Sequence, residues 1–270
     1  MEGTKIRKRK SFSVFASVVK ALFLREIEMR ISVGRSGLLW IFLEPFLQTL
    51  ILISIRVAVF EKQGGSGHAA NFDYAVFMAS GFIAFNMFRH ILTSSVGAFN
   101  ANRGLFSYKQ VKPIDTIIAR TLLQVFLSAI ILLVFLAIGV FFHFENAIPK
   151  NILMVALGYI WLTVFSFAIG LLAAIGNTFF VSIGKFIGVI SFGLLIFSAV
   201  FYPLISVPPA AREWLLYNPL VHFMEMIHGF WIDELDDRFV DYRYMALWTI
   251  VPLFIGLWLY ERLEKRIISP

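Results

Sequence analysis

The sequence contains no cysteine among its 270 residues, which excludes disulfide bonds, thiolate metal sites and thiol chemistry. Charged residues are also scarce, at 15%, whereas soluble domains carry ~25%. Hydrophobic residues make up 59% of the chain, and 30 residues are Phe. A soluble fold of this length leaves about a quarter of its chain surface in water, which is too much for such a composition. The composition therefore excludes both a soluble globular protein and a disordered one.

Motifs for nucleotide hydrolysis and hydrolytic chemistry are missing as well. The P-loop pattern G-x-x-x-x-G-K-[ST] does not occur, because Gly184 and Lys185 are followed by Phe186. There is no H-E-x-x-H, and no serine lies in a G-x-S-x-G context. We therefore expect no catalytic residue and no ATPase site in this chain.

Two groups of polar residues bear on metal binding. His222, Glu225 and His228 recur every three residues, which on a helix points the outer two about 120° apart, a poor geometry for metal ligands. The acidic residues between 233 and 241 lack the glycine-containing loop of an EF-hand. We expect ordinary helix contacts and a solvated turn, and no metal site.

Long hydrophobic runs dominate the rest of the chain. A helix crosses the hydrocarbon with ~20 apolar residues, and six runs meet that length or come near it. They are 38–60, 74–99, 116–142, 152–175, 181–201 and 244–260. The sequence predicts an all-α integral membrane protein with six transmembrane helices, forming one domain over residues 1–270.

Charge divides unequally between the two sides of these six spans. Of the 24 Lys and Arg residues, 17 are assigned to the side of both termini, including Arg120 and Lys185 near the ends of their spans, and five to the other, while the acidic residues divide six to ten. The two sides therefore carry +11 and −5. The positive-inside rule places both termini in the cytoplasm of a multi-pass inner-membrane protein. Because topology accounts for the basic excess, nucleic acid is not an expected partner.

Two further segments are predicted outside the spans. Residues 12–32 have apolar residues at helical spacing among charged ones, which predicts an amphipathic helix in the plane of the cytoplasmic interface. Residues 203–242 contain prolines that open two short helices, about 209–217 and 219–230. We expect these helices to form a re-entrant periplasmic hairpin lining protein or a wet cavity.

Polar residues within the spans indicate a path for a polar substrate. Arg89 lies on one face of its helix, and an intramembrane arginine normally faces protein or a wet cavity. A helix contact, for example between Arg89 and Glu44, is an equally good interpretation. The aromatic residues at the outer end of the fifth span fit an interfacial belt or sugar stacking. The candidate path residues are Trp40, Glu44, Gln48, Asn86, Arg89, His90, Thr93, Phe197, Phe201 and Tyr202.

The cytoplasmic loop between the second and third spans mixes apolar and basic residues. Exposed apolar side chains with a polar rim favour a protein contact over a membrane-skimming turn. The candidate contact residues are Asn102, Leu105, Phe106, Tyr108, Lys109 and Lys112.

The motifs together resemble a known family. Leu24-Arg25-Glu26-Ile27-Glu28-Met29-Arg30, then Gly37-Leu38-Leu39-Trp40-Ile41-Phe42-Leu43-Glu44-Pro45, resemble the ABC-2 type exporter permeases. Lys112-Pro113, Tyr202-Pro203 and Asn218-Pro219-Leu220 match in order and spacing. Within that family the chain is similar to the polysaccharide-export branch, and to the inner-membrane permease of group 2 capsule export.

This resemblance implies partners and a substrate. It implies a homodimer that binds two copies of a cytoplasmic ABC ATPase subunit, which would hold ATP and Mg while this chain binds no cofactor. The loop from Asn102 to Pro113 would couple to the ATPase. A lipid-linked acidic capsular polysaccharide would pass between the protomers toward a periplasmic auxiliary (co-polymerase) protein and an outer-membrane exporter. The periplasmic gate residues would be Pro203, Pro208, Trp214, Asn218 and Pro219.

Several alternatives stay open at this level. An ABC-2 permease for O-antigen, for a teichoic-acid-type polymer, or for a small drug or lipid would have nearly the same fold. A membrane glycan or lipid enzyme would need clustered ionisable groups at one depth, and apart from Arg120 and Lys185 near span ends the spans offer only Glu44, Arg56, Arg89 and His90. A structural scaffold would leave the polar face around Arg89 unexplained.

Overall fold

The computed structural model describes residues 11–32, 47–48, 51, 74–144, 146–180 and 182–268, and every regular element within these ranges is a helix. In chain order the α-helices are α1 (Ser11–Ser32), α3 (Tyr74–Val96), α4 (Ala98–Ala101), α5 (Pro113–Phe141), α6 (Ile152–Phe179), α7 (Ser182–Phe197), α8 (Pro209–Leu215), α9 (Pro219–Trp231) and α10 (Tyr242–Ile268). Two 3-10 helices, η1 (Arg103–Ser107) and η2 (Leu204–Ser206), lie in the connections. The all-helical prediction is confirmed for the described residues.

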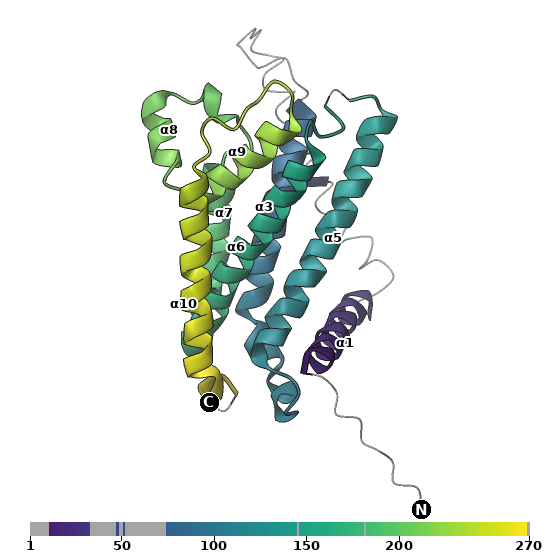
Figure 1. The fold of residues 1–270 in the computed structure, drawn as a ribbon, viewed down its shortest axis with the longest axis vertical. Coiled ribbons are helices and arrows are strands. Elements are labelled where there is room, and N and C mark those ends of the chain that lie inside the picture. The colour runs from purple at the N-terminus through teal and green to yellow at the C-terminus, as the bar shows by residue number, and fades with distance from the viewer. Residues whose placement is uncertain are drawn as a thin grey trace, which may run out of the picture.

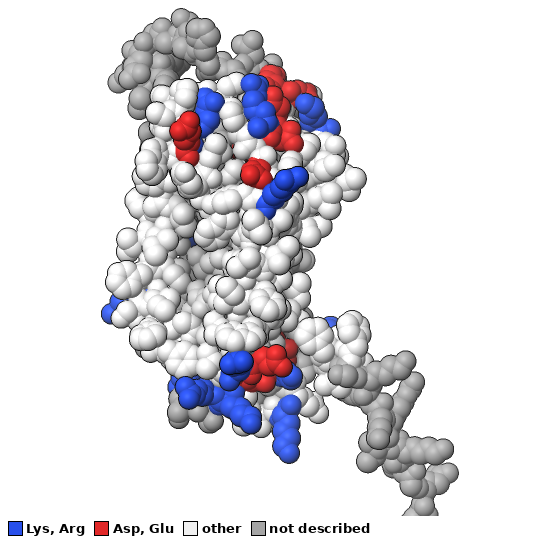
Figure 2. All heavy atoms as spheres, turned by 60° about the vertical axis from the view of Figure 1, so that its left-hand side comes forward, with Lys and Arg blue, Asp and Glu red and all other residues white. Residues whose placement is uncertain are grey.

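The long helices run in alternating directions between two ends of an elongated bundle (Figure 1). One end holds the turn after α3, the connection from α6 to α7 and the last turns of α10. We call it the basic end, after Arg103, Lys109, Lys112, Arg262 and Lys265. The opposite end holds α8 and α9, and we call it the acidic end, after Asp233, Glu234, Asp236, Asp237 and Asp241. Figure 2 shows a band with few charges between these two ends.

Helix α3 lies at the centre of the bundle. It packs against α5, α6 and α9, and its largest side chains, such as Phe77, Phe85 and Phe88, are buried. The surrounding helices instead expose apolar side chains outward, including Leu133 on α5 and Phe254 on α10. Outward apolar side chains are stable where the surroundings are lipid, which fits a bundle that lies in a membrane.

Four helices are long and apolar enough to cross a membrane by length and composition: α3, α5, α6 and α10. They coincide with four of the six predicted spans. The predicted span 38–60 lies outside the described residues, apart from Leu47, Gln48 and Ile51. The predicted span 181–201 corresponds to α7, which ends four residues early and has only 16 residues. At 1.5 Å per residue, α7 is about 24 Å long, which is less than the hydrocarbon thickness of ~30 Å.

Two side chains that follow α7 in the sequence, one of them 21 residues away, cap its last carbonyls. The Asn218 side-chain amide donates to the Phe197 carbonyl at 3.0 Å, and the Tyr202 hydroxyl donates to the Ile196 carbonyl at 3.0 Å. These bonds satisfy carbonyls that a continuing helix would have satisfied itself. The backbone then turns through Ala199, whose φ is +56°. An apolar sequence pattern does not reveal such capping, so the predicted span was too long.

The starts of α5 and α6 follow local rules. Pro113 occupies the first turn of α5, and the Asp115 carboxylate accepts the Lys112 N–H at 2.9 Å. The Asn151 side chain accepts the Met154 N–H at 3.1 Å and caps α6. Each interaction satisfies an N–H that has no partner within its own helix, so both boundaries were predictable from sequence.

The N-terminal helix α1 covers the predicted range 12–32 and packs along the half of α5 nearer the basic end (Figure 1). Val19 and Leu22 are buried, and the Phe23 and Phe126 rings meet edge to face at 6.0 Å. On its other side Phe12 is 78% exposed. The helix therefore has one apolar face on the bundle and another that protein does not cover within the described residues.

Candidate functional site

The predicted polar face of α3 runs from buried to exposed along the helix. Asn86 is 5% exposed, and neither polar atom of its side chain has a hydrogen-bond partner among the described residues. Arg89 and His90 are half-buried, while Thr93 is exposed and its hydroxyl donates to the Arg89 carbonyl at 2.8 Å. A buried amide without a partner is costly in an apolar interior and marks α3 as a candidate polar path.

The neighbours proposed for this face are described only in part. Trp40 and Glu44 lie outside the described residues, so the Arg89–Glu44 pair stays a prediction. Gln48 is half-buried. Within the described residues, no ion pair involves Arg89.

The three predicted aromatic residues at the end of α7 have different surroundings. Phe197 is 59% exposed. The Phe201 carbonyl accepts the Tyr74 hydroxyl of α3, and the Tyr202 hydroxyl caps α7 as described above. Phe201 and Tyr202 thus stabilise the acidic end, whereas the Phe197 ring is available for another contact.

Phe106, in the loop at the basic end, was predicted to be exposed, but the structure buries it. Phe106 is only 6% exposed and packs with Phe99, Ile117 and Tyr260, because η1 turns its ring under the ends of α5, α6 and α10. Tyr108, in contrast, is 66% exposed. Among the other predicted contact residues, Leu105 is half-buried, and Lys109 and Lys112 are exposed.

Asn102 has a structural role in the same turn. It is 1% exposed, and its side-chain amide donates to the Ala98 carbonyl at 2.8 Å. Its side-chain oxygen accepts the Arg25 guanidinium of α1. Asn102 therefore ties the loop to α1 and does not present its amide to an outside partner.

A buried ion pair that the sequence analysis missed joins three helices at the same level. Arg120 of α5 donates from Nε to the Glu26 carboxylate of α1 at 2.9 Å, with side-chain exposures of 14% and 12%. Its Nη1 also donates to the Ser94 carbonyl of α3 at 2.6 Å. The available signal was an arginine within an apolar run, which requires a partner. Together with Arg25 and Asn102, this pair links α1 to the turn after α3.

Most of the predicted gate residues at the acidic end have a structural role. Pro219 occupies the first turn of α9, and Asn218 caps that helix by accepting the Leu220 N–H at 3.0 Å. Pro203 is buried and Pro208 is exposed. Trp214 on α8 is 78% exposed, and its ring contacts that of Tyr217 at 6.2 Å, centroid to centroid.

The His222, Glu225 and His228 series belongs to the buried face of α9. The two ring nitrogens of His222 contact the Leu216 carbonyl at 2.9 Å and the Asp241 N–H at 3.1 Å. Glu225 accepts the Leu204 N–H at 3.0 Å. Among the described residues, no group of three or more His, Cys, Asp or Glu side chains is placed to hold a metal ion. Two of the three residues therefore join α9 to its flanking loops.

Burial makes the charge of Glu225 sensitive to pH. Desolvation raises the pKa of Glu225 to about 7, above its ordinary value of 4.5, although the Leu204 N–H bond acts to lower it. The unfolded chain loses this proton near pH 4.5 and the folded chain near pH 7. Glu225 therefore increasingly destabilises the fold as the pH rises across that window, and the cost is constant above it.

We expect Glu225→Gln to be more stable than wild type at pH 8, with the difference fading toward pH 5. Glutamine keeps an oxygen for the Leu204 N–H but carries no charge. Thermal unfolding of the purified protein at both pH values measures the change, which should be on the order of a few degrees at pH 8. A difference that is independent of pH would contradict the assigned ionisation.

Comparison with known proteins places the chain in a family. The ABC-2 type transporter family matches residues 17–230. The chain is 36% identical over 263 residues to the polysialic acid transport protein KpsM of Escherichia coli, covering 97% of this chain and 99% of that protein. It is 28% identical over 270 residues to the capsule polysaccharide export inner-membrane protein BexB of Haemophilus influenzae, covering 98% of each. It is 27% identical over 250 residues to CtrC of Neisseria meningitidis, a protein of the same description, covering 93% of this chain and 92% of that protein.

The apolar helices and their buried polar residues define the class as a helical membrane protein. The match over most of its length is more specific: the chain belongs to the ABC-2 type transporter family.

Proposed function

We propose that this protein is the membrane-spanning permease subunit of an ATP-driven exporter of capsular polysaccharide in a bacterial inner membrane. The observation that carries the proposal is the similarity to KpsM, which extends over nearly the whole of both chains. KpsM is named for polysialic acid transport. BexB and CtrC, named for capsule polysaccharide export, support the same substrate class. The proposed substrate is a lipid-linked acidic polysaccharide.

The charge distribution supports an orientation. The basic end would face the cytoplasm and the acidic end the periplasm, by the positive-inside rule. Both termini would then be cytoplasmic, with six spans that include residues 38–60 and α7, and with α8 and α9 as a re-entrant periplasmic hairpin. An acidic exit would not retain an anionic polymer.

The energy source would be a separate subunit. The chain has no P-loop, so we propose a homodimer that binds two copies of a cytoplasmic ABC ATPase carrying ATP and Mg. The exposed part of the loop at the basic end, from Tyr108 to Lys112, is the proposed contact. The Glu26–Arg120 pair next to it would transmit motion of the loop to α1.

The substrate would pass along the polar face of α3 and leave beside α8. Asn86 and Arg89 are the proposed polar contacts within the membrane. Phe197 and Trp214 expose aromatic rings at the acidic end that suit stacking on sugar rings. A periplasmic auxiliary protein and an outer-membrane exporter would continue the path.

Deletion of this chain in its native host tests the function directly. We expect loss of surface capsule and accumulation of the lipid-linked polymer inside the cell, with both reversed by the wild-type chain. Co-purification with the host ABC ATPase should yield a 2:2 complex whose ATP hydrolysis depends on this chain. A normal capsule after deletion, with another glycan or lipid retained inside instead, would identify a different substrate.

We expect Tyr108→Asp to weaken ATPase binding without destabilising the membrane subunit. The Tyr108 ring is largely exposed, so an aspartate there disturbs no packing. Phe106→Asp is the matched contrast, because it places a carboxylate in the packed cluster around Phe99 and should lower the amount of folded protein. Co-purification yield and thermal unfolding separate the two effects. If Tyr108→Asp leaves ATPase binding unchanged, the contact lies elsewhere.

We expect Arg89→Gln to reduce polysaccharide export severalfold while leaving assembly with the ATPase intact, and Arg89→Lys to retain most export. The reason is that a positive charge on α3 would attract an acidic polymer within the membrane. Capsule per cell and co-purification yield are the measurements. Loss of assembly in Arg89→Gln would instead assign Arg89 to helix packing.

A further inference from the structure

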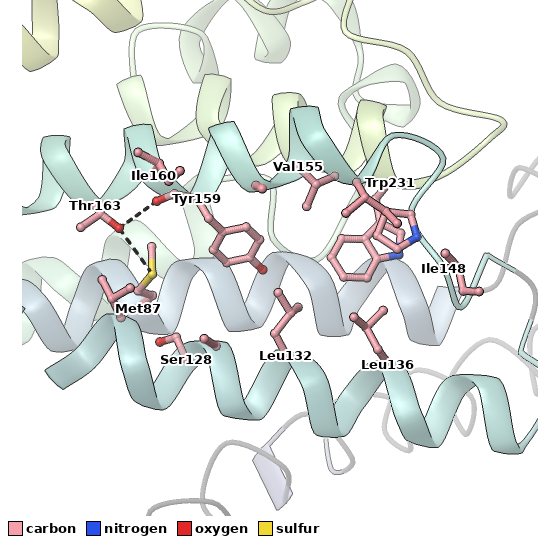
Figure 3. A pocket seen from close by; sticks show the side chains of 15 residues that line it. Met87, Ser128, Leu132, Leu136, Ile148, Val155, Tyr159, Ile160, Thr163 and Trp231 are labelled. Atoms are coloured by element: carbon pink, nitrogen blue, oxygen red, sulfur yellow. Dashed lines mark hydrogen bonds between the residues drawn. The ribbon is translucent and has the colours of Figure 1, made fainter. Parts of the chain in front are cut away.

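A groove of about 340 Å³ opens between α5 and α6 on the outer side of the bundle (Figure 3). Its walls are apolar side chains such as Leu132 and Leu136 from α5 and Val155 and Ile160 from α6. Met87 of α3 lies toward one end and Trp231 of α9 toward the other. None of the described residues that we assign to the substrate path lines this groove.

Three of the four described polar side chains on the groove walls donate hydrogen bonds, Ser128 being the other one. The Tyr159 hydroxyl donates to the Ser80 carbonyl at 3.3 Å, and the Thr163 hydroxyl donates to the Tyr159 carbonyl at 2.8 Å. The Trp231 indole N–H donates to the Asn146 carbonyl at 3.1 Å. A water molecule in the groove would find few of the two to four partners that it needs. The groove is therefore suited to an apolar occupant.

The rim of the groove faces the surroundings of the bundle. Ile152 is 64% and Ile160 61% exposed, and both belong to helices long and apolar enough to span a membrane. Around this rim the medium is hydrocarbon, so the groove is continuous with the bilayer along its length. An acyl chain can enter from the side without crossing any polar barrier.

The end of the groove at Trp231 opens onto charges of both signs. Lys150 follows the lining residues Ile148 and Pro149, is exposed, and lies 3.4 Å from the Asp233 carbonyl through its ammonium nitrogen. The Asp233 side chain is exposed, as is that of Glu234, whose carboxylate accepts the Asn146 amide at 3.1 Å. One cation and two carboxylates therefore lie in the same exposed cluster at this end of the groove.

We propose that this groove binds one acyl chain of a bilayer phospholipid whose zwitterionic headgroup carries a phosphate and a primary ammonium. The phosphate pairs with Lys150, and the ammonium faces Asp233 and Glu234. Charge complementarity favours this headgroup, because a purely anionic one would meet the two carboxylates and an uncharged one would offer the Lys150 ammonium no anion. Such a lipid holds α5 and α6 to α9 at the acidic end.

The test uses the full chain in its complex, in nanodiscs containing a phosphatidylethanolamine probe with a photoreactive group on one acyl chain. We expect crosslinks concentrated on α5 and α6 residues of the groove. Ala129→Trp fills the groove and should reduce this labelling severalfold. Ala137→Trp is the matched control, because Ala137 is an exposed alanine of the same helix outside the lining, and it should leave labelling unchanged. Ile160→Trp is a second filling variant if Ala129→Trp is poorly folded.

The headgroup is tested with a diacylglycerol probe of the same acyl chains. Wild-type groove labelling should be severalfold higher with the phosphatidylethanolamine probe, and Lys150→Gln should abolish that preference. Equal labelling of the groove and of the open face around Ala137 would overturn the proposal. So would a photocrosslinker at position 129 that joins residues 33–73 or a second copy of the chain, since protein would then fill the groove.

Discussion

Replacing Arg120 with methionine should lower the stability of the membrane subunit by about 2 kcal/mol, because it removes the nearest charged partner of a largely buried carboxylate. That carboxylate is Glu26 on α1, whose side chain is 12% exposed and which keeps only the longer contact with Arg25 at 3.8 Å among the described residues. The Ser94 carbonyl of α3 loses its donor as well. We therefore expect α1 to detach from α5 and the turn after α3 to loosen.

Thermal unfolding of the purified protein measures the loss, and limited proteolysis of α1 locates it. The double variant Arg120→Met/Glu26→Met should recover much of the stability, since an apolar pair of similar volume often replaces a buried ion pair without cost. Arg238→Met is the control. Arg238 pairs with Asp236 at 2.7 Å, but both side chains are more than half exposed, so little stability should be lost. Equal effects of Arg120→Met and Arg238→Met would refute the structural role of the buried pair.

The double variant also distinguishes a structural role of the Glu26–Arg120 pair from a role in transport. If Glu26 and Arg120 only hold α1 in place, the methionine pair should restore export together with stability. If the ion pair transmits motion from the ATPase contact, stability returns while ATP hydrolysis remains uncoupled from export. Measuring both in the 2:2 complex distinguishes the two roles.

Gly81→Ala should destabilise the contact between α3 and α9 by about 1–3 kcal/mol, the usual cost of overpacking a filled core. A Cβ added at Gly81 would lie 2.6 Å from Nε2 and 2.9 Å from Cε1 of His228. The His228 ring is fully buried and lies 4.0 Å from the Phe77 ring, centroid to centroid, so it has little room to move. In an isolated helix alanine is more favourable than glycine. The predicted destabilisation therefore comes from packing alone.

Gly193→Ala on α7 provides the matched control for this prediction. In the part of the chain that the structure describes, no atom beyond the neighbouring helix backbone lies within 4 Å of a Cβ added there, so the alanine should be neutral or mildly stabilising. A second variant tests the cause: Gly81→Ala combined with His228→Ala should be less destabilised than the sum of the two single variants. Strict additivity in thermal unfolding would show that the ring is not what the new methyl group meets.

Local sequence was sufficient for much of the architecture. The short helices after α7 were predictable because Pro209 and Pro219 each occupy a first turn, and Asn218 caps the second helix within two residues. The spans α3, α5, α6 and α10 were predictable because a run of apolar residues requires no knowledge of its neighbours. Family membership likewise rested on motifs that are local in the chain.

The candidate site was less predictable. Phe106 was expected on the surface, because a short apolar stretch between basic residues does not reveal which side faces the core. Arg120 was counted only as an inner positive charge, because its partner Glu26 is 94 residues away in the chain. Both errors concern contacts between segments that fold together only in three dimensions.

The sequence by itself determined the membrane class, most helix positions, the opposite charge of the two ends and the absence of a P-loop. These properties depend on composition and on neighbours along the chain. Only the tertiary structure decided that α7 stops after 16 residues, that Arg120 pairs with Glu26, that His228 lies against Gly81, and that α5 and α6 leave a groove between them. Burial and hydrogen-bond partners depend on which helices pack together. That packing depends on contacts between side chains that are far apart in the sequence.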